Sequence, residues 1–290
     1  MKKENKTEEQ LIKEIDVLRI RLAELEKSKT KNEEMERLIS KSSSLKVELI
    51  ATRKLDEKLK LITDGLVDIF GADFARIWMI RTGDLCEKGC IHADVTEGPH
   101  VCRDRNRCLH LMASSGRYTH IDGDHRRVPF GAYKIGKVAS SEYPNFITND
   151  VTHDPQVHHH EWAKSLDLVS FAGYRLLSPD NGPIGVMGLF KQQPIIPDEE
   201  NLLEDLANTT SHVIMVGKTE EKLQKAHADL EKRVKERTVD LRQANTKLKE
   251  EIIEREKAQQ AIKESEEKYR SIVEKFARIS NEILLDISKQ

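Results

Sequence analysis

Apolar residues at both ends of this chain recur every three or four positions among mostly charged residues. In the first arm, the repeat consists of Leu11, Ile15, Leu18, Leu22 and Leu25. Alternate steps of four and three are the a/d spacing of a coiled coil. The pattern weakens at the serine-rich run 40–44, which we interpret as a break or a helix start. It resumes over 45–66, which predicts a helix leading into a globular domain.

A second helical arm follows the centre of the chain, from residue 218 to 262. Its apolar positions are spaced like heptads with some slippage: Leu223, Leu230, Val234, Leu241, Ala244, Leu248 and Ile252. Arg237 and Glu251 occupy positions that a regular seam would make apolar. An isolated helix with so few apolar residues is marginal in water. We therefore expect the arms to pair in a homodimer.

Glycine and proline divide the chain into three parts, because they mark turns and interrupt helices. All 14 glycines and all 8 prolines lie between Gly65 and Gly217. We expect an N-terminal coiled coil over 1–44, a domain over 45–217, a signalling helix over 218–262 and a further helix over 263–290.

The central part shows patterns of both strands and helices, which predicts an α+β fold. Four segments are expected to be strands: 72–80, 108–114, 169–176 and 184–190. The last two are joined by the turn 178–183, whose Asp-Asn-Gly sequence is typical of an antiparallel hairpin. A closing helix is expected to begin at 197–200, where proline precedes three acidic residues.

Several stretches in this order make residues 45–217 resemble a GAF domain. They are Val128-Pro129-Phe130 with Gly136-Lys137-Val138-Ala139, then 149–155, 166–171, 180–187 and 197–203. The resemblance implies a six-stranded antiparallel sheet with helices on one face and a ligand pocket on the other. It also implies a sensory rather than a catalytic role.

The C-terminal part resembles sensor histidine kinases of bacteria and archaea. Residues 231–255 are similar to their signalling helix, and residues 265–272 resemble the entry helix of a PAS domain. The PAS strands, a phosphoacceptor His-Glu motif and a glycine-rich ATP lid are not found in the sequence. The resemblance implies the input half of such a kinase, without a catalytic domain in this chain. A kinase or response-regulator component is the expected output partner.

The charge balance excludes some partners. The chain has 48 basic and 50 acidic residues, for a net charge of -2, which gives no reason to expect nucleic acid. No apolar run approaches the roughly 20 residues that span a bilayer, and the charged N-terminus is unlike a secretory signal. We expect a cytoplasmic protein, in which thiols are usually reduced.

All four cysteines fall within 23 residues: Cys86, Cys90, Cys102 and Cys108. They lie in and directly after a polar insertion at 83–107, which cannot fold by burying apolar surface. Four thiolates are suited to Zn or an iron–sulfur cluster, although the spacing is not that of a Cys-x2-Cys knuckle. His92 or His110 could replace one ligand. A disulfide-forming redox switch and four unrelated thiols remain alternatives.

Other polar residues give weaker indications of a site. Tyr118, His120 and Arg127 are candidates for lining the pocket, and 158–160 is a run of three histidines at an expected helix start. Haem is a further possible cofactor, which would make the domain a redox or gas sensor. A metal-dependent enzyme is the least supported alternative, because four cysteine ligands would close the metal's coordination shell.

Overall fold

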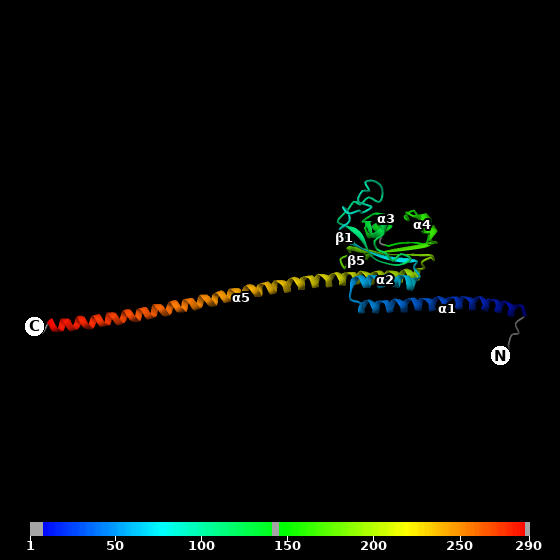
Figure 1. Cartoon of the computed structure of the whole chain (residues 1–290). Helices are drawn as coiled ribbons and strands as arrows, with labels where there is room; N and C mark the ends of the chain where they lie inside the picture. The colour runs from blue at the N-terminus through cyan, green and yellow to red at the C-terminus, as the bar shows by residue number, and fades with distance from the viewer. Residues whose placement is uncertain (1–7, 141–144, 288–290) are drawn as a thin grey trace, which may run out of the picture. The chain divides into compact units, whose positions relative to one another are not determined.

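The computed structural model describes residues 8–140 and 145–287, and the side chains of 12–140 and 145–281. The contacts divide the chain into two compact units, Met1–Glu220 and Glu221–Gln290. The first unit holds the sheet, the cores and every site discussed below (Figure 1). Leu11 of the predicted first seam lies outside the described side chains.

The N-terminal arm is one helix, α1 (Glu8–Ala51), followed by α2 (Leu55–Phe70). The expected break at 40–44 is wrong. The Ser44 hydroxyl donates to the Ser40 carbonyl one turn back, so the hydroxyl is satisfied without interrupting the helix. The break falls instead at 52–54, where Lys54 has an extended backbone.

A six-stranded antiparallel sheet forms the centre of the first unit, in the order β3-β2-β1-β6-β5-β4. Its strands are β1 (Phe74–Arg81), β2 (Cys108–Gly116), β3 (Arg127–Pro129), β4 (Asn145–Thr148), β5 (Ser170–Leu177) and β6 (Pro183–Lys191). The four predicted strands are confirmed, and β3 and β4 are additional. The predicted hairpin is also confirmed, since the Ser178 N–H donates to the Gly182 carbonyl at 2.9 Å and Asn181 has a φ of 60°.

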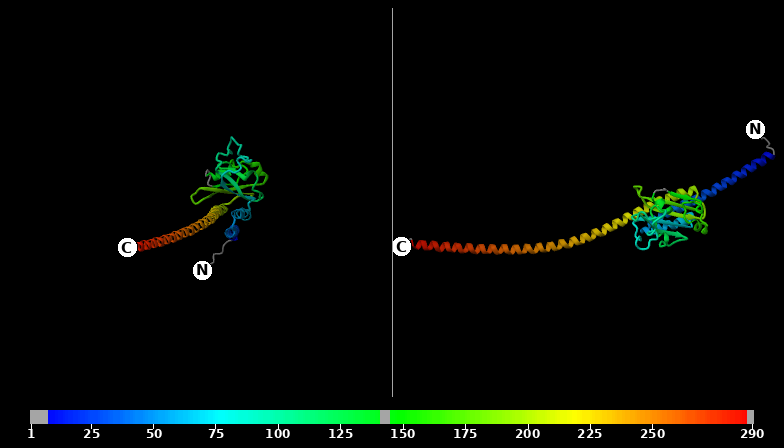
Figure 2. Two further views of the ribbon diagram at one scale, coloured as in Figure 1. Left: turned by 60° about the vertical axis from the view of Figure 1, so that its left-hand side comes forward. Right: turned by 90° about the horizontal axis from the view of Figure 1, so that it is seen from above.

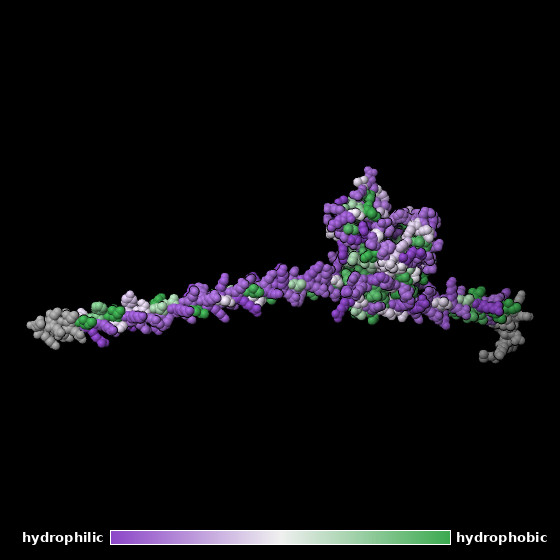
Figure 3. Space-filling view, viewed as in Figure 1, coloured by the Kyte–Doolittle hydropathy of each residue, from purple (hydrophilic) through white to green (hydrophobic). Residues whose placement is uncertain are grey.

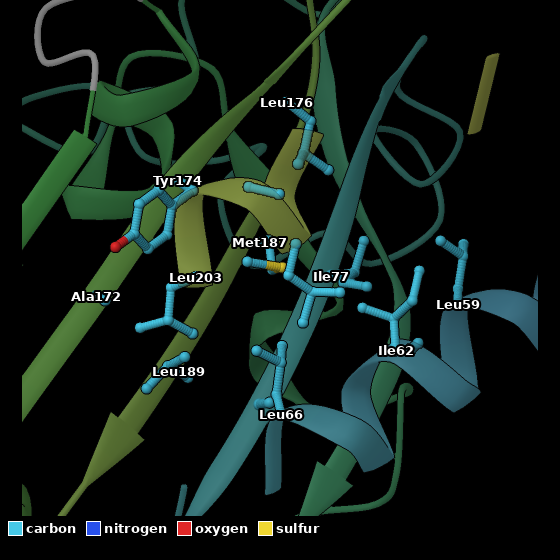
Figure 4. Close-up of a cluster of buried hydrophobic side chains, with 14 of the residues drawn as sticks. Leu59, Ile62, Leu66, Ile77, Ala172, Tyr174, Leu176, Met187, Leu189 and Leu203 are labelled. Atoms are coloured by element: carbon cyan, nitrogen blue, oxygen red, sulfur yellow. The ribbon is translucent and has the colours of Figure 1, made fainter. Parts of the chain in front are cut away.

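One face of the sheet is covered by α2 and the start of α5 (Pro197–Ile287), and the C-terminal half of α1 packs on the outer side of these two helices (Figures 1 and 2). Leu59, Ile62 and Leu66 of α2 point toward the sheet, where Ile77, Met187 and Leu189 meet them (Figure 4). Lys31 of α1 also pairs with Asp198 of α5 at 2.7 Å. The apolar stripes of these helices bury a continuous core against the strands.

The other face of the sheet carries a second, more aromatic core. It is covered by the 3-10 turn Asp124–Arg126, by α3 (Tyr133–Ala139) and by α4 (His160–Ser165). These elements are short and joined by long loops, so they enclose the sheet less completely than the helices opposite. The predicted six-stranded antiparallel sheet is confirmed, but the expectation of helices on one face only is wrong, because the short helices α3 and α4 lie on the other face.

The second unit consists of the remainder of α5, from Glu221 to Ile287. Its described apolar side chains are exposed: Leu223, Leu230, Val234, Leu241, Leu248 and Ile252 are each more than half accessible to solvent. Figure 3 shows scattered green patches along this helix on a mainly purple surface. Among the described helices of the whole chain, none is both long and apolar enough to cross a membrane.

Candidate ligand cavity and cysteine-rich insertion

A cavity of about 240 Å3 lies between the sheet and the segments that cover its second face. Phe74, Trp78 and Phe190 of the strands form its floor, and Trp162 of α4 forms part of its wall. Phe74 stacks on Phe190 with ring centroids 4.8 Å apart. The cavity is therefore an apolar, largely aromatic space suited to a flat organic group.

Lys134 is the most unusual polar residue of this cavity. Only 7% of its surface is exposed, and its ammonium lies 4.4 Å from the ring centroid of Phe190 and 4.6 Å from that of Phe171. Burial lowers the pKa of Lys134 to about 7, while the charge of Asp154 acts in the opposite direction. A lysine in this position is thus only partly charged at neutral pH, because apolar surroundings disfavour the ammonium form.

Arg76 of β1 brings a second cation to the same cavity. It is 9% exposed, and its Nε donates to the Ser114 hydroxyl at 3.2 Å. Its guanidinium lies over the rings of Phe74 and Tyr118, 5.4 Å from each centroid. Burial lowers the pKa of Arg76. Among the described residues that line the cavity there is no aspartate or glutamate to pair with either cation.

Three histidines also line the cavity: His125, His158 and His159. Burial, followed by nearby positive charges, lowers the pKa of His125 to about 4 and that of His158 to about 3. Both residues nevertheless keep more than a third of their surface in solvent, which weakens the effect of burial. Lys134 is therefore the group whose charge depends most strongly on the cavity. The third residue of the predicted histidine run, His160, begins α4 and bonds through Nε2 to the Asp154 carbonyl at 2.7 Å.

The cysteine-rich insertion connects β1 to β2 and has turns but neither helix nor strand. Its base is closed by a hydrogen bond from the Gly83 N–H to the Arg105 carbonyl at 2.8 Å. Asp84 accepts two hydrogen bonds from Arg127 of β3, at 2.7 and 2.6 Å. Hydrogen bonds with Arg127 lower the pKa of Asp84, so this clamp keeps the carboxylate charged.

The four cysteines are free thiols in one neighbourhood. Cys86, Cys90 and Cys102 are partly exposed, whereas Cys108 is buried at the start of β2. The pKa of Cys108 is raised to about 12, mainly by burial and in smaller part by the other three thiols. Burial also raises the pKa of Cys102, with contributions from Cys86 and Cys90. Such thiols are poor nucleophiles, because the thiolate is the reactive form.

The donor set suits a soft metal, but the side chains are not gathered around a common point. Within the described parts of the chain, no group of three or more His, Cys, Asp or Glu side chains is arranged to hold a metal ion. His92 bonds through Nδ1 with the Tyr133 hydroxyl at 3.5 Å. His110 lies 3.8 Å from Asp84, and its Nε2 has no hydrogen-bond partner.

The insertion also reaches the cavity. His100 stacks on Tyr133, with ring centroids 3.8 Å apart and planes inclined by 4°. Tyr133 in turn lies 4.7 Å from His158, and both line the cavity. Tyr133 has a φ of 54°, a left-handed conformation that is uncommon for a bulky residue. Contacts from both sides hold its ring in this position.

The three predicted pocket residues lie near the main cavity without lining it. Tyr118 and His120 line a neighbouring hollow of about 210 Å3, which shares Arg76, His125 and Trp162 with the cavity. Arg127 lines a smaller hollow next to Cys90.

Sequence reasoning missed the residues that give the cavity its charge. Lys134 follows Tyr133 and precedes Ile135 at the start of a short helix. A lysine is almost never fully buried, so its identity gave no reason to place it inside. Its position beside two apolar residues was the only available indication. Arg76 gave a clearer indication, since it is the sole charged residue among the apolar residues of 74–80.

Comparison with known proteins identifies the family to which this domain is similar. The sequence profile that defines the GAF domain matches residues 52–215, more than half of the chain. No curated protein matches the chain. The matched region begins at the break between α1 and α2 and ends within α5.

Solved structures with a similar fold include three from bacteria. The GAF domain of a phosphoenolpyruvate-protein phosphotransferase from Coxiella burnetii is 17% identical, with a TM-score of 0.49 over 65% of this chain and 98% of that one. Free methionine-R-sulfoxide reductase from Neisseria meningitidis, in complex with its substrate, is 15% identical. Its TM-score is 0.46, over 64% of this chain and 92% of that one. The GAF domain of A. aeolicus nlh2 in an inactive state is 14% identical. Its TM-score is 0.44, over 62% of this chain and 96% of that one.

Proposed function

This chain belongs to the GAF domain family, a family of regulatory and sensory domains in signalling proteins, and we propose that its cavity receives a small molecule as the signal. The observation that carries this proposal is the aromatic cavity with two buried cations, Lys134 and Arg76. A pocket of convergent polar groups in apolar walls is the usual form of a small-molecule site. We infer a non-catalytic role, because the described residues of the cavity include no paired carboxylates of the kind that serve as general acid and base in a hydrolytic site.

The start of α5 provides a route from the cavity to the rest of the protein. Leu203 and Leu206 of α5 are fully buried against the sheet, on the face opposite the cavity. The Thr210 hydroxyl contacts the sulfur of Met187 on β6 at 3.7 Å. A ligand that shifts β6 would therefore displace this part of α5. We propose that α5 passes this change to a kinase or response-regulator partner.

A homodimer is part of the proposed mechanism. The apolar residues of the second unit are exposed in the single chain and repeat at heptad-like intervals. A second copy of the same helix has the matching seam, and the mixed charges around it oppose neither orientation. Because Arg237 and Glu251 interrupt the seam, the paired helices could pack in two arrangements. Ligand binding would then shift the population from one arrangement to the other.

Ligand-observed NMR with neutral and charged single-ring compounds tests the proposal. The matched variant is Ile135→Trp, which places a larger side chain at the cavity wall. A second variant, Val157→Phe, keeps the test valid if the first does not fold. We expect compounds that bind the wild-type chain and lose binding in a folded variant. Absence of binding to the wild type, or equal binding to the filled cavity, would overturn the proposal.

The four cysteines support a second candidate, a redox or metal site in the insertion. The favouring observation is that the other three thiols each raise the pKa of Cys108, so all four share one neighbourhood. Zn or an iron–sulfur cluster suits four thiolates, but their present positions would have to close around the metal. The proposed signalling route through the cavity and α5 therefore does not depend on a metal.

Metal analysis and a UV–visible spectrum of anaerobically purified protein test this second candidate. A shared site predicts one metal or cluster per chain, lost from each of four single Cys→Ser variants. His92→Ala and His110→Ala report whether a histidine replaces one thiol. Metal-free wild-type protein would exclude a metal site, and thiols that form no disulfide on mild oxidation would exclude the redox switch.

Haem is less well supported by the geometry. The cavity of about 240 Å3 is below the roughly 300–1,000 Å3 of sites for drug-sized ligands, and a haem is larger than such ligands. Its binding would require the covering segments to move apart. The same spectrum tests this alternative, because haem would give a Soret band.

A further inference from the structure

We propose that the cavity selects a small aromatic anion, a single-ring carboxylate or phosphate whose negative group lies between Lys134 and Arg76. This inference rests on the proposed function and specifies the chemistry of its ligand. The arrangement of charge in the cavity is the observation that supports it.

The charge in the cavity is unbalanced. Lys134 and Arg76 are each at least nine-tenths buried, and both line the same space. A buried charge is costly unless it is paired and hydrogen-bonded. No acidic side chain lines the cavity in the described part of the chain, and Asp154 acts on Lys134 only as a charge outside the cavity wall.

The hydrogen-bonding capacity of the two cations is also unused. The described contacts of the Lys134 ammonium are with the rings of Phe171 and Phe190. Arg76 uses its Nε for Ser114, and no described residue bonds its two terminal nitrogens. Those nitrogens form the planar fork that binds carboxylate or phosphate oxygens in pairs. An anion would therefore satisfy donors that the protein leaves open.

The walls define the rest of the ligand. Phe74, Trp78, Trp162 and Phe190 present rings to the cavity, and Trp162 meets Phe74 edge-on at 5.9 Å. Aromatic rings prefer offset or edge-to-face contact with another ring. A cavity of about 240 Å3 limits the occupant to one ring or a fused pair with a short arm. The ligand class is thus an aromatic acid, not a long-chain or polymeric anion.

Matched acid and amide pairs test this inference, because an amide keeps the shape of the acid and removes its charge. The probes are benzoate, phenylacetate and indole-3-acetate, each with its amide, and phenyl phosphate as the second anion type. Binding to the full chain is measured by ligand-observed NMR and titration calorimetry. We expect at least one anion to bind with a Kd of about 1 mM or tighter, at least tenfold more tightly than its neutral counterpart. Comparing the Kd of phenyl phosphate with those of the carboxylates shows whether the cavity prefers a phosphate or a carboxylate group.

Two variants assign the preference to the cavity. Lys134→Met keeps the length of the side chain without its charge, and should weaken anion binding about tenfold while leaving amide binding unchanged. Lys164→Met removes one positive charge outside the cavity, on the exposed surface of α4. This variant should change neither anion binding nor amide binding.

Three results would overturn the inference. Amides that bind as tightly as acids would leave the proposed ligand cavity in place but exclude anion selection. Equal loss of anion binding in both variants would show general surface attraction. Binding of neither class at millimolar concentration would contradict both this inference and the proposed function.

Discussion

The imidazole of His100 lies flat against the ring of Tyr133, with centroids 3.8 Å apart and planes inclined by 4°. The first residue belongs to the cysteine-rich insertion, and the second lines the cavity. This contact joins the two candidate sites of the domain. His92 of the same insertion also contacts Tyr133, with ring centroids 5.4 Å apart, so the insertion meets the edge of the cavity at this tyrosine.

Replacement of His100 should loosen the insertion and the edge of the cavity together. Aromatic pairs contribute about 0.5–1.5 kcal/mol, so His100→Ala should increase amide hydrogen exchange severalfold within 83–107 and at the start of α3. The control is Ile91→Ala in the same insertion, where the side chain is 57% exposed. Unchanged exchange in His100→Ala, or equal changes in both variants, would show that the stack does not hold the insertion.

The apolar seams of the two arms predict the oligomeric state. The intact chain should scatter light as a dimer of 33.3 kDa subunits. Leu18→Lys with Leu241→Lys places charges in both seams and should yield monomers, because a charge at an a or d position disfavours helix pairing.

The control for the seam changes two exposed apolar residues that lie off it. Val17→Lys with Val239→Lys introduces the same charges, and both valines are exposed in the single chain. This variant should remain dimeric. A wild-type mass of one subunit would contradict the predicted pairing, and monomers from both double variants would show that the seam residues are not special.

The pKa of Lys134 predicts a pH dependence of stability. Burial lowers this pKa from 10.5 to about 7, so between these values the unfolded chain binds a proton that the folded chain lacks. The contribution of Lys134 to the free energy of unfolding should therefore increase by more than about 1 kcal/mol as the pH rises from 7 to 9. Arg76, His125, His158, His159 and Asp154 also face or influence the lysine, so the comparison is with Lys134→Met.

Urea unfolding of the two proteins at pH 7 and pH 9 measures this difference. Lys134→Met should be more stable than the wild type at pH 7, and the gap should narrow at pH 9. A constant gap would mean that Lys134 keeps an ordinary lysine pKa in the fold.

The strands at the centre of the sheet could be predicted because they are long and apolar. The residues 72–80 and 184–190 alternate or run apolar for most of their length, and both became central strands. The short strands β3 and β4 have three and four residues, too few for a pattern. The serines at 40–44 were misleading, because a hydroxyl can bond within a helix as well as cap one.

The two candidate sites also differ in how far the sequence predicts them. The cysteine cluster is visible in the sequence because cysteines are rare and closely spaced. The cavity is not visible, because its residues come from strands and helices far apart along the chain. Lys134 lies inside only because α3 turns that face toward Phe171 and Phe190, a tertiary effect that local sequence does not encode.

The charge state of Lys134 is the most direct test of an electropositive ligand cavity. The ε-methylene resonances of 13C-labelled lysines can be followed by NMR against pH, and Lys134 is assigned by its absence from Lys134→Met. One lysine should titrate near pH 7, and its pKa should rise when an aromatic acid is added. A Lys134 that titrates with the other lysines, near 10.5, and does not respond to the acids would contradict this prediction.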